Sequence, residues 1–136
     1  MKLSILVVDD EPMTRHMLRV MLELEGYQIT EAVDGLDALK KIEQEQPDAL
    51  ILDVMMPKMD GITVCEKLRQ DPKTRDLPII MLSGRSHHEA VARGLKAGAN
   101  KYMGKPMLRE DLLAGLREVL GRFSVLTSPV IQTRPL

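Results

Sequence analysis

Short apolar runs alternate with longer amphipathic segments along most of this chain. The first run, Ser4–Val8, has no polar alternation, which is typical of a parallel strand buried on both faces of a sheet. Four further runs have strand length and are bounded by turn-forming residues. The predicted strands are Ser4–Val8, Gln28–Ala32, 49–52, 78–82 and 101–103.

Each predicted strand is followed by a segment with apolar residues at helical spacing. The first helix opens at Glu11 and Pro12, because proline suits a first helical turn, and Gly26 ends it. The later helices are predicted at residues 36–44, 60–70, 87–97 and 110–120. Five successive strand–helix units imply an α/β fold with a parallel sheet covered by helices on both faces.

Methionines recur at positions 13, 17 and 21 of the first predicted helix. This spacing places Met13, Met17 and Met21 on one stripe of the helix. We expect the stripe to pack into the core and near the functional site.

The length of 136 residues suits a single domain, predicted over residues 1–123. Residues 124–136 mix serine, threonine and two prolines with isolated aliphatic residues and show no period. We expect this segment to be an extended or disordered tail or linker, so the chain could be the front part of a longer protein.

Charge and cysteine content narrow the function classes. The formal net charge of −1 argues against direct contact with nucleic acid or with a membrane surface. The single cysteine, Cys65, excludes an internal disulfide framework and fits a reducing compartment. Every apolar run is too short to cross a bilayer, and the first is too short for a signal peptide. We therefore expect a cytoplasmic protein.

Residues with ionisable or hydroxyl side chains follow four of the predicted strands. Asp9 and Asp10 follow the first strand, Asp53 the third, Ser83 the fourth and Lys105 the fifth. The carboxyl ends of parallel strands gather at one edge of the sheet, where ligands bind. These five residues should therefore converge on one small site.

Three carboxylates at close range repel one another, and a divalent cation resolves this repulsion. Mg²⁺ prefers oxygen ligands and is usually held by one or two carboxylates together with phosphate oxygens. Asp9, Asp10 and Asp53 suit such a site, and a backbone carbonyl such as that of Met55 could add a ligand.

A carboxylate can also attack phosphorus and form an aspartyl phosphate. Asp53 is the preferred nucleophile, because it stands apart from the acidic pair at the end of a central strand. Lys105 could neutralise one phosphoryl oxygen, and the Ser83 hydroxyl could hydrogen-bond another. Taken singly, each aspartate could instead be a turn or cap residue, but five such residues at successive strand ends favour the shared site.

These motifs resemble the receiver domain of the two-component response regulator family. The resemblance covers residues 3 to about 121. It is carried by ILVVDDEP at 5–12, LDVMMPKMDG at 52–61, PIIMLSG at 78–84, GA at 98–99 and KYMGKP at 101–106. It implies a doubly wound flavodoxin-like fold with sheet order 2-1-3-4-5.

The resemblance also implies roles for individual residues. Asp53 would accept a phosphoryl group, and Ser83 and Lys105 would bind its oxygens. Asp9, Asp10, Asp53 and the Met55 carbonyl would hold Mg²⁺, with Mn²⁺ as an alternative. Ser83 and Tyr102 would form a coupled switch, and the peptide bond between Lys105 and Pro106 would be cis.

The implied function is a signalling switch rather than an enzyme, since the chain would catalyse only its own phosphorylation and dephosphorylation. Its donor would be a sensor histidine kinase or a phosphotransfer protein. Phosphorylation would shift the face formed by the fourth helix, fifth strand and fifth helix. That face would contact an effector or a fused output domain, or form a dimer.

Three alternatives stay open at this point. The chain could be the receiver part of a larger regulator with a DNA-binding or enzymatic output domain. It could be an interaction module that acts without phosphorylation. It could be a phosphate-ester hydrolase, although such enzymes commonly carry a second acid two residues after the nucleophile, where this chain has Met55.

Overall fold

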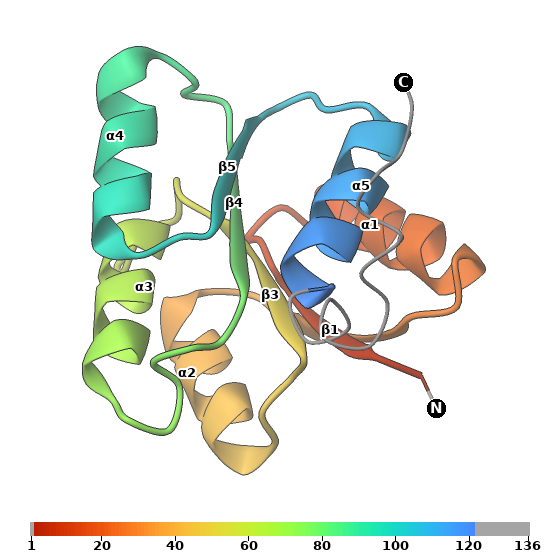
Figure 1. Ribbon diagram of the computed structural model, residues 1–136, viewed down its shortest axis with the longest axis horizontal. Coiled ribbons are helices and arrows are strands. Elements are labelled where there is room, and N and C mark those ends of the chain that lie inside the picture. Colours follow the sequence, from red (N-terminus) through yellow and green to blue (C-terminus); the bar gives the residue numbers. More distant parts are fainter. Residues whose placement is uncertain (1, 122–136) are drawn as a thin grey trace.

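The computed structural model describes residues 2–121. Five parallel strands form one sheet in the order β2-β1-β3-β4-β5 (Figure 1). The strands are β1 (Ser4–Val8), β2 (Gln28–Ala32), β3 (Ala49–Asp53), β4 (Ile79–Ser83) and β5 (Lys101–Gly104). The predicted doubly wound α/β fold and its sheet order are therefore confirmed.

Five helices cover the two faces of this sheet (Figure 1). Helices α1 (Pro12–Leu24) and α5 (Arg109–Leu120) lie on one face. Helices α2 (Gly35–Gln44), α3 (Gly61–Gln70) and α4 (His88–Ala97) lie on the other, with α4 beside β5. The predicted tail 124–136 lies outside the described residues, and the domain boundary at residue 123 stays a prediction.

Alternate residues of the central strands pack into two separate hydrophobic cores, one on each face of the sheet. Ile5 and Val7 of β1 pack with Leu18 of α1, whereas Leu6 and Val8 belong to the cluster on the opposite face. This division follows from the strand period of two, which sends successive side chains to opposite faces. It explains why β1, β3 and β4 are apolar at almost every position.

Side chains preceding four of the helices act as caps, and they set where those helices begin. Glu11 accepts a hydrogen bond from the Met13 amide, Asp34 from Asp37, and Asp60 from Thr63. His87 caps α4 in the same way, so α4 begins at His88 rather than at the predicted residue 87. These caps fix where α1, α2, α3 and α4 begin, directly after the loops at the candidate-site edge of the sheet.

The expectation that the methionine stripe of α1 packs in the core is wrong for two of its three members. Met13 is 80% exposed and Met17 is 52% exposed, while Met21 is partly buried. Helix α1 instead buries Leu18 and Leu22 against the sheet. The exposed residues form a second apolar stripe on the opposite side of the helix, which we call the α1 stripe. It consists of Met13, Met17, Val20 and Leu24.

None of the helices in residues 2–121 combines the length and the apolar character needed to cross a bilayer.

Candidate functional site

The predicted site residues come together at one edge of the sheet. In the sheet, β1 pairs with β3, β3 with β4, and β4 with β5. The registers place Val8 beside Leu52, and Ser83 beside Gly104. The acidic pair, Asp53, Ser83 and Lys105 therefore leave four neighbouring strands at the same end.

Asp9 is the most firmly held carboxylate of the site. Its side chain is only 2% exposed, and its Oδ1 accepts a 2.9 Å hydrogen bond from the Glu11 amide. Its own amide donates to the Ala32 carbonyl of β2. Asp10, in contrast, is exposed to solvent. The pair thus offers one buried and one accessible carboxylate.

Lys105 connects two carboxylates that come from different strands. Its Nζ lies 2.8 Å from Asp9 Oδ2 and 3.3 Å from Asp53 Oδ1. Its backbone amide donates a 2.7 Å hydrogen bond to the Ser83 carbonyl, and the following bond to Pro106 is cis. Burial lowers the pKa of Lys105, but its bonds to Asp9 and Asp53 outweigh this, so the net pKa is raised.

Asp53 occupies the last position of β3 and is 4% exposed. Burial, followed by the negative charge of Asp9, raises the pKa of the Asp53 carboxyl to about 6. Lys105 and a long 3.4 Å hydrogen bond from the Met55 amide act in the opposite direction. The protein's own groups thus only partly stabilise the negative charge of the Asp53 carboxylate.

Among the described residues, Asp9, Asp10 and Asp53 form a cluster suited to a metal ion. One oxygen from each carboxylate lies within 4.8 Å of the other two. An all-oxygen set with a single lysine as counter-charge fits a hard divalent cation such as Mg²⁺. The part that the sequence assigned to the Met55 carbonyl stays a prediction.

Ser83 and Tyr102 lie on either side of the loop that joins β4 to α4. Ser83 is fully buried, and its Oγ accepts a 3.0 Å hydrogen bond from the Arg85 amide. The Tyr102 hydroxyl donates to the carbonyl of the same Arg85. The ring of Tyr102 lies so close to Gly94 of α4 that a Cβ there would come within 2.5 Å of it. Both residues named as a switch therefore hold one loop.

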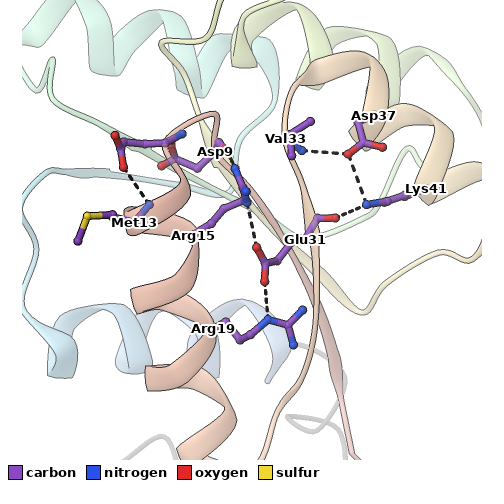
Figure 2. A network of polar contacts seen from close by, with 9 residues as sticks. Asp9, Met13, Arg15, Arg19, Glu31, Val33, Asp37 and Lys41 are labelled. Atoms are coloured by element: carbon purple, nitrogen blue, oxygen red, sulfur yellow. Dashed lines mark hydrogen bonds and ion pairs between the residues drawn. The ribbon is translucent and has the colours of Figure 1, made fainter.

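Arg15 is a residue beside this site that sequence reasoning missed. Its Nη1 donates a 2.8 Å hydrogen bond to the carbonyl of Asp9, and its Nε binds Glu31 of β2 (Figure 2). Its position one helical turn after the Glu11 cap was the available signal, but nothing in the pattern of residue types identifies a bond to a backbone oxygen.

The family model described as the response regulator receiver domain matches residues 5–117. The response regulator MprA of Mycobacterium ulcerans is 46% identical over 122 residues, which are 90% of this chain and 52% of that protein. The DNA-binding dual master transcriptional regulator RpaA of Synechocystis sp. is 40% identical over 118 residues, 87% of this chain and 49% of that protein. The chain thus spans about half the length of these relatives.

A solved structure supports the same assignment. The receiver domain of the sensor histidine kinase PA1611 from Pseudomonas aeruginosa has a TM-score of 0.83 and 30% identity. The match covers 89% of this chain and 99% of that one, and that structure has a magnesium ion coordinated in its active-site cleft.

The expectation of no direct contact with nucleic acid finds no support here, because RpaA is described as a DNA-binding regulator.

The family model, the relatives and the fold agree on one assignment. The chain belongs to the response regulator receiver domain family of two-component signalling systems.

Proposed function

We propose that this chain is a phosphorylation-controlled switch in which Asp53 accepts a phosphoryl group from a phosphohistidine. The observation that carries the proposal is the placement of Lys105 between Asp9 and Asp53. These two aspartates form a cluster of three carboxylates with Asp10. The buried, incompletely compensated Asp53 is the nucleophile. An oxygen of its carboxylate forms the new P–O bond as the P–N bond of the donor breaks, and the donor imidazole keeps that electron pair.

The chain's own residues orient and neutralise the phosphoryl group. Lys105 carries a cation 3.3 Å from Asp53, where it can contact one phosphoryl oxygen. Within residues 2–121, the Ser83 hydroxyl accepts a hydrogen bond from Arg85 and donates none, so its proton is available to a second oxygen. Bound Mg²⁺, or Mn²⁺ in its place, would supply further positive charge, held by Asp9, Asp10, Asp53 and the Met55 carbonyl.

The switch follows from the two bonds to Arg85. When Ser83 turns its hydroxyl toward the phosphoryl group, the bond from the Arg85 amide is weakened. The same residue accepts from Tyr102 through its carbonyl, so movement of the loop is transmitted to β5. Tyr102 also lines a cavity of about 720 Å³ beside α4, which leaves room for its ring. The face of α4, β5 and α5 is the proposed output surface for an effector, a fused domain or a second copy.

The α1 stripe is the surface that we assign to the phosphodonor. Helix α1 begins immediately after the acidic pair, so a protein that places a histidine at Asp53 must cover the start of this helix. Met13 and Met17 there are exposed and can pack against apolar residues of a kinase or phosphotransfer protein. Because the relatives are about twice as long, an output domain in the whole protein belongs to the same proposal.

Intact mass spectrometry after incubation with Mg²⁺ and acetyl phosphate tests the proposal. We expect one added phosphoryl group, which is lost without Mg²⁺ and in Asp53→Asn. Asp60→Asn is the matched control, because Asp60 caps α3 near the same edge and asparagine caps equally well. Absence of an adduct, combined with no binding of the non-hydrolysable mimic beryllofluoride, would contradict the proposal.

A further inference from the structure

Arg15 makes two hydrogen bonds from one guanidinium group, in two directions. Its Nη1 lies 2.8 Å from the carbonyl oxygen of Asp9, and its Nε lies 2.9 Å from Glu31 Oε1 (Figure 2). The side chain is only 14% exposed. A planar guanidinium with fixed donors suits such a two-way contact, whereas the single ammonium of lysine does not.

The start of α1 places Arg15 over the end of β1. Glu11 caps the helix, and the Arg15 amide donates to the Glu11 carbonyl in the first turn. One turn into the helix, the side chain therefore reaches back to Asp9, the residue that follows the strand. The contact joins the helix to the strand end that carries the acidic pair.

Fixing the carbonyl of Asp9 also restrains Asp10. The carbonyl of Asp9 and the amide of Asp10 belong to one planar peptide unit, so its orientation determines where the Asp10 side chain starts. The other polar atoms of Asp9 are already occupied by Ala32, Glu11 and Lys105. The bond from Arg15 thus completes the set that holds this peptide.

Glu31 is itself held in place, which keeps Arg15 from swinging away. Its second carboxylate oxygen binds Arg19, and its backbone carbonyl accepts a hydrogen bond from Lys41 of α2 (Figure 2). Lys41 in turn pairs with Asp37. The network therefore extends from α2 across the edge strand β2 to α1 and the acidic pair.

We propose that Arg15 is a positioning residue, which orients the peptide between Asp9 and Asp10 so that the Asp10 carboxylate joins the cation site. It touches neither the phosphoryl group nor the metal, and acts through a backbone oxygen. The part that concerns the metal rests on the function proposed above, whereas the orientation of the peptide does not.

Arg15→Met and Arg19→Met form a matched pair. Both lie on α1 and bind Glu31, but in the described residues only Arg15 donates to the Asp9 carbonyl. Each substitution leaves Glu31 with the other arginine. Calorimetric titration with Mg²⁺ should show affinity about 10-fold weaker for Arg15→Met, as for other residues that support metal ligands, and nearly unchanged for Arg19→Met. Equal weakening in both variants, or none in either, would overturn the inference.

Nuclear magnetic resonance of the metal-free protein provides a second readout. The order parameter of the Asp10 amide should fall in Arg15→Met and stay at about 0.85 in Arg19→Met. Arg15→Lys, which keeps the charge and the helix, should restore only part of the rigidity. An Asp10 amide that stays rigid in Arg15→Met would refute the inference. A wild-type protein that binds no Mg²⁺ would count against the proposed function, while this comparison still decides the role of Arg15.

Discussion

The ammonium group of Lys105 lies 2.8 Å from the carboxylate of Asp9, closer than its 3.3 Å distance to Asp53. The cation is therefore shared unequally, and the proposed phosphoacceptor receives the longer contact. This relationship accounts for the raised pKa of Asp53, because burial and the charge of Asp9 outweigh the partial compensation by Lys105.

Replacing Lys105 by methionine should destabilise the metal-free protein by about 2 kcal/mol at neutral pH, because two buried carboxylates lose a charged hydrogen-bond partner. Urea unfolding measured with a chelator present checks this loss. Lys101→Met is the matched control, since Glu118 is exposed and Lys101 only partly buried, and ion pairs at the surface contribute about 0–1 kcal/mol. A loss no larger than that of the control would contradict the shared-cation account.

Asp53 should make the stability of the metal-free protein depend on pH, with stability highest when its carboxyl group is protonated. Between its ordinary pKa of 3.8 and its folded-state pKa of about 6, the folded protein binds this proton more tightly than the unfolded chain does. The contribution of Asp53 to stability therefore falls as pH rises through this range. Relative to wild type, Asp53→Asn should gain up to about 3 kcal/mol between pH 4 and about pH 7.

Glu31 serves as an internal control, because its contribution to stability should change with pH in the opposite direction to that of Asp53. The hydrogen bond from Arg19 outweighs burial and lowers the pKa of Glu31. Its stabilisation is present above the unfolded-state pKa and is lost as pH falls through the lower folded-state pKa. Unfolding curves over a pH series should therefore show Glu31→Gln less stable than wild type at neutral pH, with the gap closing in acid. Parallel pH profiles for the two variants would refute both assignments.

Mg²⁺ should stabilise the folded protein by mass action, by about 2.7 kcal/mol at a concentration 100 times its dissociation constant. Thermal unfolding with and without Mg²⁺ measures this effect. Asp10→Asn should remove most of it, because Asp10 belongs to the three-carboxylate cluster. Glu11→Gln should keep it, since the neighbouring Glu11 caps α1 and a glutamine oxygen can accept the same bond. Equal responses in the two variants would argue against the cation site.

Gly61 should not tolerate a methyl group. A Cβ at this position would lie 2.4 Å from the Asp53 carbonyl oxygen and 2.9 Å from the Cα of Val54, and both are backbone atoms. Gly61→Ala should therefore cost about 1–3 kcal/mol and disturb the end of β3. Gly84→Ala, where a Cβ meets nothing within 4 Å, should change stability by less than about 0.5 kcal/mol. Chemical unfolding of both variants compares them, and equal stability would show that β3 and α3 can separate without loss.

The fold was predictable because the buried strands carry an uninterrupted apolar signal. The pattern placed each strand start within one residue, but it ended β3, β4 and β5 one residue early, at the last apolar side chain. The hydrogen-bonded ladder continues through Asp53 and Ser83, whose polar side chains are buried in the site. The strand order came from the family resemblance, since the apolar pattern alone does not specify which strands are neighbours.

The sequence also could not decide which stripe of α1 faces the sheet. Leu18 and Leu22 compete with Met13 and Met17 for that role, and the spacing of both stripes is helical. Only the contacts with the sheet resolve the choice. The site residues were found because they follow strands, whereas Arg15 acts through a hydrogen bond to a carbonyl, and every residue offers a carbonyl.

The chemical groups of the site come from widely separated parts of the chain: the residues of the Lys105–Asp9 contact are 96 positions apart. A chain still emerging from the ribosome therefore holds the acidic pair and Asp53 long before the lysine that completes them. On the proposed function, such a chain could not accept a phosphoryl group until β5 has joined the edge of the sheet and brought Lys105 to the site. The proposed phosphorylation would then occur only on chains in which β1, β3 and β5 have already assembled into the sheet.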